Sequence, residues 1–294
     1  MKILIIKLGA AGDVLRTTPL LRKLNGEIYW LTSDLNLLLL QPLSQLASCI
    51  AFSNRNRIID IQFDLAINLE DSLDCCEFLN QLKVKKIFGP YLDSNGAISY
   101  TKDSREWFDL SVISRFGKKI ADQMKLLNRK SYQELIFTGL GLIFNGEQYI
   151  LPPSSSTDCR GDIAVAPKAG SVWPMKNWGY FDLLIDRLRD LGLTVNILPR
   201  RASLLEHIGD IKNHRYLISG DSLPMHIALG CGIKCFTFFI CTSPWEIYDY
   251  GIQRKIVSPS LNRYFYKRNF DEKATFSISL EDAYKSILDH LKIV

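Results

Sequence analysis

Residues 2–19 read KILIIKLGAAGDVLRTTP, and this stretch decides the fold class. Residues 3–6 form an aliphatic run that is apolar on both faces, which is typical of a buried strand in a parallel sheet. A turn with two glycines, Gly9 and Gly12, follows the run directly, and a helix is expected from Val14 onward. A buried strand, a glycine turn and a helix in this order form the first unit of an α/β domain.

The same organisation recurs along the chain. Segments with helical spacing of apolar residues, such as 181–191 and 283–291, alternate with further apolar runs. Strands that alternate with helices predict an α/β fold with parallel sheets. The further runs lie at residues 28–31, 65–68, 163–166, 195–198, 216–218 and 235–239.

The length of 294 residues exceeds one ordinary core and predicts two domains. Residues 151–161, LPPSSSTDCRG, are the stretch richest in proline, serine and glycine, and a new buried run follows them. We therefore expect two Rossmann-like domains facing a cleft, an N-terminal one over residues 1–151 and a C-terminal one over residues 162–294. The last helix is expected to pack back on the N-terminal domain.

Composition excludes several classes of protein. With 47% hydrophobic and 23% charged residues, the chain is neither disordered nor collagen-like. A net charge of +5 is too small for a dedicated nucleic-acid-binding protein. The seven cysteines are odd in number and form no CxxC pair, which favours reduced thiols over disulfides or a metal site. No apolar stretch is long enough for a membrane span or a secretory signal, so we expect a cytoplasmic protein.

The glycine turn lies where open α/β sheets bind ligands, at the carboxyl end of a strand. Gly9 and Gly12 would let a ligand or the other domain approach the backbone closely. Asp13 would project from the end of the turn as a functional carboxylate, or it would cap the helix that starts at Val14. The motif is not GxGxxG, and no acidic residue follows a second strand at the usual interval, so an NAD site is not supported.

Residues 169–178, AGSVWPMKNW, form a second turn after a buried run. The backbone amides of Gly170 and Ser171 could bind a diphosphate, with Lys176 as a positive charge. In the alternative interpretation, Trp173 and Trp178 pack the turn and Lys176 is solvated.

Residues 219–228, SGDSLPMHIA, follow another buried run. Asp221 and Ser222 open a helix whose amino-terminal amides suit an anion. His226 lies one turn further, on the same face as Ser222. In the alternative interpretation, His226 is a hydrogen-bonded core residue.

Three motifs, in this order, resemble the heptosyltransferases of glycosyltransferase family nine, which have the GT-B fold. Residues 2–24, KILIIKLGAAGDVLRTTPLLRKL, are similar to the opening motif of that family. Residues 166–184, APKAGSVWPMKNWGYFDLL, resemble its donor-domain loop, and residues 219–232, SGDSLPMHIALGCG, resemble its donor motif. The resemblance spans nearly the whole chain.

The resemblance implies an inverting glycosyltransferase that moves a heptose from ADP-heptose to a hydroxyl of a lipopolysaccharide acceptor. Asp13 would be the general base, with Gly9 and Gly12 in the close-approach loop. The donor site would take Gly170, Ser171 and Lys176 at the phosphates, with Asp221, Ser222 and His226 completing it. No metal and no cofactor besides the nucleotide sugar would be required.

The partners implied are a nucleotide-sugar donor and a sugar-containing acceptor, with no nucleic acid and with peripheral contact at the inner membrane. Lys125 and Arg129 belong to a basic cluster over residues 118–130 that could meet an anionic acceptor. The alternative interpretation, which has equal weight, is that these basic residues form an ordinary solvent-exposed face of a helix.

Four departures from the family pattern bear on the site, and one of them is that Ile240-Cys241 replaces a common Gly-Pro pair. Leu223 stands where the family usually has glycine, and about one α/β unit is missing after Leu198. Asn262, Phe265 and Phe270 occupy the cysteine positions of a family tail, so no thiolates are available there for a metal. Two alternatives therefore stay open: a related enzyme with another nucleotide-sugar donor and a small-molecule or protein acceptor, and a noncatalytic nucleotide-sugar-binding relative.

Overall fold

The computed structural model describes residues 1–40 and 43–291. The chain divides into two compact units, Met1–Pro152 and Pro153–Val294. Residues 292–294, at the end of the expected C-terminal domain, lie outside the described residues. The expected cleft between the two domains stays a prediction.

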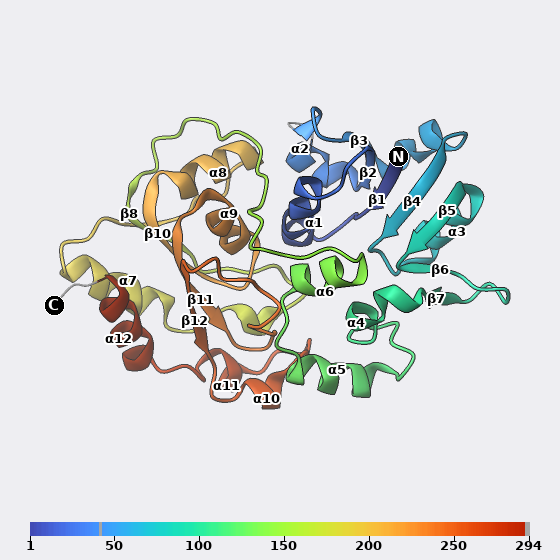
Figure 1. Cartoon of the computed structure of the whole chain (residues 1–294). Coiled ribbons are helices and arrows are strands. Elements are labelled where there is room, and N and C mark those ends of the chain that lie inside the picture. Colours follow the sequence, from blue (N-terminus) through green and yellow to red (C-terminus); the bar gives the residue numbers. More distant parts are fainter. Residues whose placement is uncertain (41–42, 292–294) are drawn as a thin grey trace. The chain divides into compact units, whose positions relative to one another are not determined.

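The first unit is built on a parallel five-stranded sheet in the order β3-β2-β1-β4-β5 (Figure 1). Strand β1 is central, and its Ile3 is paired with Ile28 of β2 on one side and Leu65 of β4 on the other. The run at residues 3–6 is fully buried because helices cover both faces of a parallel sheet. The strands are β1 (Lys2–Ile6), β2 (Glu27–Thr32), β3 (Ser48–Ala51), β4 (Gln62–Asn68) and β5 (Lys83–Phe88).

After β5 the chain of the first unit leaves the sheet. A short antiparallel hairpin comes first, and three helices follow it (Figure 1). The last of these helices begins with a capping box between Ser131 and Glu134, which satisfies two backbone amides at its start. The α-helices and strands of this unit outside its main sheet are α1 (Ala11–Thr17), α2 (Leu37–Leu40), α3 (Leu73–Gln81), β6 (Pro90–Leu92), β7 (Ile98–Tyr100), α4 (Arg105–Phe108), α5 (Lys118–Leu127) and α6 (Tyr132–Gly139).

The second unit has its own parallel five-stranded sheet, in the order β12-β11-β10-β8-β9. The predicted α/β class is thus confirmed in both units. The strands are β8 (Gly161–Ala166), β9 (Val195–Ile197), β10 (His214–Gly220), β11 (Lys234–Phe239) and β12 (Gln253–Val257). The α-helices are α7 (Phe181–Asp190), α8 (Leu204–Lys212), α9 (Leu223–Cys231), α10 (Leu261–Tyr264), α11 (Glu272–Thr275) and α12 (Leu280–Leu291), and a short 3-10 helix spans Pro174–Lys176.

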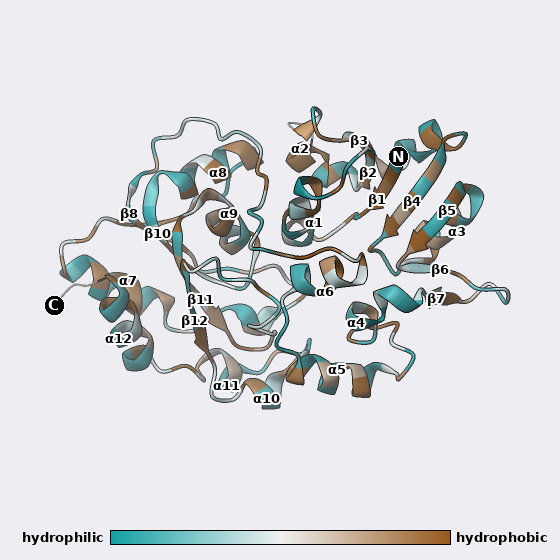
Figure 2. Ribbon diagram, viewed as in Figure 1, coloured by the Kyte–Doolittle hydropathy of each residue, from teal (hydrophilic) through white to brown (hydrophobic). Residues whose placement is uncertain are grey.

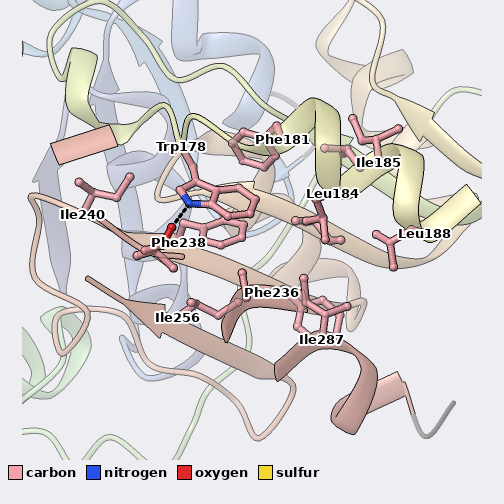
Figure 3. Packing of buried hydrophobic residues seen from close by; sticks show 14 of the residues in the cluster. Trp178, Phe181, Leu184, Ile185, Leu188, Phe236, Phe238, Ile240, Ile256 and Ile287 are labelled. Carbon is pink, nitrogen blue, oxygen red and sulfur yellow. Dashed lines mark hydrogen bonds between the residues drawn. The ribbon is translucent and has the colours of Figure 1, made fainter. Parts of the chain in front are cut away.

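Trp178 anchors the core of the second unit (Figure 3). Its ring stacks on Phe238 of β11 at 4.2 Å between centroids, and its Nε1 donates a hydrogen bond to the carbonyl of Ile278. Ile287 of α12 is fully buried in the same core, so α12 packs on its own unit. The expected contact of this helix with the N-terminal domain stays a prediction.

Within the described residues, no helix combines the length and the apolar character that crossing a membrane requires.

Candidate functional site

Each sheet has one place where the strand order reverses, between β1 and β4 in the first unit and between β8 and β10 in the second. Open α/β sheets bind ligands at the carboxyl ends of the strands that flank such a place. The glycine turn follows β1, and the turn of residues 169–178 follows β8. Asp221 directly follows β10. The motifs singled out in the sequence therefore lie at the two positions where this fold binds ligands.

Glu70, just beyond the end of β4, fixes the glycine turn. Its Oε1 accepts hydrogen bonds from the Nζ of Lys7 at 2.7 Å, the backbone amide of Leu8 at 2.7 Å and the amide of Gly9 at 3.2 Å. The fully buried Asn68 accepts a hydrogen bond from the amide of Glu70 through its Oδ1. The sequence analysis does not single out Glu70. Its position just after a buried apolar run was a signal that could have marked it as a candidate site residue.

Lys7 is a buried cation between two carboxylates. Burial alone lowers the pKa of its ammonium, but the negative charges of Asp13 and Glu70 outweigh that effect and raise the pKa above its ordinary value. Lys7 therefore stays charged at neutral pH and supplies a fixed positive charge beside Asp13.

Asp13 is the third residue of α1, which begins at Ala11, and its N-cap is Ala10. The interpretation of Asp13 as the cap of a helix starting at Val14 is therefore wrong. Its Oδ1 lies 2.9 Å from a terminal nitrogen of Arg16, and its side chain is 35% exposed. The positive end of the helix dipole also favours a carboxylate in the first turn. Asp13 is thus an oriented carboxylate that solvent can still reach.

Arg16 connects Asp13 to an aromatic cluster. Its buried guanidinium lies 4.2 Å from the centre of the Tyr132 ring, and Trp107 packs edge-on against Tyr132. The Nζ of Lys125 lies 5.3 Å from the Trp107 ring, and Lys125 is buried. The alternative of a solvated face is therefore wrong for Lys125.

Arg129 is exposed and lies just beyond the end of α5. Its guanidinium donates hydrogen bonds to the carbonyls of Leu126 and Asn128. The structure thus places Lys125 against the aromatic cluster and Arg129 on the surface.

In the second unit, Asn177 closes the turn that follows β8. Its Oδ1 accepts a hydrogen bond from the amide of Ala169 at 2.6 Å. Gly170 and Ser171 lie exposed within this closed turn, so their backbone is accessible to a ligand.

Lys176 and Asp221 form an ion pair with little access to solvent. The Nζ of Lys176 donates to both the carbonyl and the Oδ2 of Asp221, each at 2.8 Å, and Thr242 donates to the same Oδ2. The two side chains are 13% and 12% exposed. The alternative of a solvated Lys176 is therefore wrong.

The pKa of the Asp221 carboxyl reflects this pairing. Burial raises it, but the charge and hydrogen bond of Lys176, together with His226 and Thr242, lower the pKa to about 2. Asp221 is therefore a permanent anion at neutral pH. Thr242, which lies beyond the end of β11, completes this cluster and was not predicted from the sequence.

Ser222 is the N-cap residue of α9, and its Oγ donates to the carbonyl of Gly220 at 3.3 Å. A Cβ atom at Gly220 would lie 2.7 Å from the carbonyl oxygen of Lys176, so the close approach of the two segments requires glycine there. His226 is buried in α9, one turn after Ser222. The structure thus brings Lys176, Asp221, Ser222 and His226 together, and their role in binding a donor stays a prediction.

No protein-family model matches this sequence, and no curated protein sequence matches it. Solved structures match its fold over the whole chain. A family 9 glycosyltransferase from Veillonella parvula aligns with a TM-score of 0.67 and 16% identity, covering 100% of this chain and 98% of the other. E. coli heptosyltransferase WaaC with ADP gives a TM-score of 0.63 at 15% identity, with 99% of both chains covered.

The chain has the fold of glycosyltransferase family 9. A third match, E. coli ADP-heptose lps heptosyltransferase II, covers 99% of both chains with a TM-score of 0.58 and 14% identity. The GT-B fold that the sequence motifs implied is thus confirmed. Because the identities are so low, the likeness concerns the fold, and the chemistry must be argued from this chain's own residues.

Glu70→Gln should lower the free energy of unfolding by about 1–3 kcal/mol, because the buried Lys7 loses the carboxylate that it contacts at 2.7 Å. Chemical denaturation at neutral pH measures the loss. In a double-mutant cycle with Lys7→Met, the two substitutions should be strongly non-additive. Additive effects of the two changes would show that the ion pair does not stabilise the turn.

Proposed function

We propose that this chain is an inverting glycosyltransferase that transfers a heptose or related sugar from an ADP-sugar to an acceptor hydroxyl. The observation that carries the proposal is the largely buried Lys176–Asp221 pair at the strand-order reversal of the second sheet. The fold of family 9 and the ADP in the matched E. coli heptosyltransferase support it.

Lys176 is proposed to bind the diphosphate of the donor. Two of the three N–H groups of its ammonium are used by Asp221, which leaves the ammonium oriented with one donor for a phosphate oxygen. The amides of Gly170 and Ser171 and the first turn of α9 at Ser222 would supply further donors. His226 would complete the donor site from the next turn of the same helix.

These groups would act on the leaving group of the reaction. The diphosphate gains negative charge as the bond to the sugar breaks, and preorganised donors at that place each contribute about 3–4 kcal/mol to catalysis. The hydrogen bond from Lys176 to Asp221 holds the ammonium in position in the folded unit. Lys176 would therefore not need to move as the negative charge develops on the diphosphate.

Asp13 is proposed to take the proton from the acceptor hydroxyl as that oxygen attacks the anomeric carbon. Its carboxylate is partly exposed and is oriented by Arg16. A positioned general base accelerates such a step by about a hundredfold to ten-thousandfold. Lys7 and Glu70 would hold the glycine turn, with Gly9 and Gly12, in the shape that lets the acceptor approach.

We propose that no metal ion takes part in the transfer. Lys176 and the backbone amides would meet the phosphate charge. Among the described residues, no group of three or more histidine, cysteine, aspartate or glutamate side chains could hold a metal. Leu223 is the first residue of α9, so its side chain borders the proposed phosphate site and would affect which sugar fits.

We further propose that the protein works in the cytoplasm, on a sugar-containing acceptor at the inner membrane. A different nucleotide-sugar donor with a small-molecule or protein acceptor is the alternative within the same fold. A noncatalytic nucleotide-sugar-binding protein is the alternative from another class. These three proposals can be distinguished in two steps. The stabilising effects of different nucleotides are compared first, and turnover of the matching donor sugar is assayed next.

ADP should raise the melting temperature of the purified protein more than UDP, GDP or TDP do, because ligands that bind only the native state stabilise it. The shift should persist in EDTA, since protein groups alone are proposed to bind the phosphates. A larger shift of the melting temperature with another nucleotide would mean that the donor carries that nucleotide instead of ADP. Loss of the ADP shift in EDTA would contradict the metal-free site, and nucleotide binding without turnover of any donor would favour the noncatalytic alternative.

A further inference from the structure

The positive charge of this protein is concentrated in one segment. Residues 112–130 contain six basic residues and one acidic residue, which give that segment a charge of +5. The whole chain has 36 basic and 31 acidic residues and the same net charge of +5. The rest of the chain, with thirty residues of each sign, is therefore neutral, and the segment around α5 carries the net charge.

The same segment exposes large apolar side chains. Val112, Phe116, Ile120 and Leu127 are between 43% and 74% exposed. Ile120 and Leu127 are seven residues apart in α5 and therefore lie on the same side of the helix, two turns apart. In Figure 2, hydrophobic and hydrophilic colours lie next to each other along α5.

The body of the first unit holds this segment in place. Asp109 is buried and binds the guanidinium of Arg115 through both carboxylate oxygens, each at 3.1 Å. The hydroxyl of Tyr100 donates to Asp109 and accepts from the amide of Arg115. On α5, Ala121 and Lys125 are buried and face inward. The backbone that carries the exposed apolar and basic side chains is thus held in a defined conformation.

Three cations of the segment are paired with carboxylates on it or next to it. Asp109 binds Arg115, Asp122 binds Lys118, and Glu106 binds Lys130. Lys119 is exposed and adds positive charge beyond these pairs. The surface therefore stays positive after these three ion pairs are counted.

We propose that Val112, Phe116, Ile120 and Leu127, with Lys118, Lys119, Arg129 and Lys130, form a surface that binds an anionic lipid bilayer. We call it the α5 surface. Apolar side chains next to lysine and arginine on one helix are typical of helices that lie in the lipid headgroup region. A second copy of this chain would bring like charges together, so the charge favours lipid over self-association.

The test is binding of the full chain to vesicles, measured by co-sedimentation without donor or acceptor. Vesicles of phosphatidylglycerol and phosphatidylcholine should bind the protein, vesicles of phosphatidylcholine alone should not, and binding should fall as salt rises. Lys118→Gln with Lys119→Gln should weaken binding about 30-fold, since each removes one cation near the surface. Leu127→Ser should weaken it about tenfold.

The matched control is Lys83→Gln with Lys212→Gln, which removes the same charge from exposed lysines elsewhere. This control should bind almost as the parent does, and an equal loss in both double variants would overturn the α5 surface. Equal binding to neutral vesicles, or no vesicle binding at all, would also overturn it. So would concentration-dependent dimerisation that Leu127→Ser abolishes without any vesicle binding. The proposed transfer reaction can fail without affecting any of these results, because no catalytic residue is changed and no turnover is measured.

Discussion

Asp13→Asn should lower the rate of sugar transfer by about a hundredfold to ten-thousandfold while the affinity for ADP stays within a few-fold. Asparagine keeps the shape of the side chain but cannot accept the proton of the acceptor hydroxyl. The ion pair with Arg16 at 2.9 Å is also lost, so the melting temperature of the variant should be measured beside its turnover. Steady-state kinetics and calorimetry with ADP check both parts of the expectation.

Asp74→Asn is the matched control for this experiment. Asp74 also lies in the first turn of a helix, α3, and it is exposed. Removing its charge removes the same favourable interaction with a helix dipole without touching the glycine turn. We expect near-normal turnover from Asp74→Asn. Wild-type turnover from Asp13→Asn itself would reject Asp13 as the general base.

Lys176→Met should have large effects on both ADP binding and stability. It should weaken ADP binding about ten- to hundredfold, because a charge-assisted hydrogen bond to the diphosphate is lost. It should also lower the free energy of unfolding by about 3 kcal/mol, because Asp221 is left as a largely buried carboxylate without its cation. Calorimetry with ADP and chemical denaturation measure the two quantities separately.

The Lys176–Asp221 pair should also make the stability of the protein depend on pH. The pKa of Asp221 is lowered in the folded protein from its usual 3.8 to about 2. The stabilisation from its ionised form is therefore fully present above about pH 4 and is lost as the pH falls through 2. Lys176→Met removes the main source of this shift, so the stability gap between parent and variant should narrow in acid.

The double variant with Lys176→Met and Asp221→Asn separates binding from folding. Removing the orphaned charge should restore part of the lost stability. ADP affinity should stay low, because the ammonium that meets the phosphate is still missing. Recovery of ADP affinity in the double variant would mean that Lys176 only stabilises the fold.

The inner strands of both sheets could be predicted from the sequence, but some edge strands could not. Strands such as β1 and β10 are buried on both faces, so their apolar runs are continuous. Strand β5 at the edge of the first sheet reads KVKKIF, and β12 at the edge of the second reads QRKIV. Their outward positions carry charged side chains, which hides the strand pattern in a single sequence.

The sequence by itself determined that the chain alternates strands and helices, and that its glycine turn and Asp221 follow buried strands. These are local properties, because burial on both faces imposes an apolar run wherever it occurs. Only the tertiary structure decided which strand ends are neighbours. It joined Lys7 to Glu70 across 63 residues and Lys176 to Asp221 across 45, and it turned Lys125 inward. Such pairs depend on strand order, which the packing of the whole sheet sets and which no local stretch of sequence encodes.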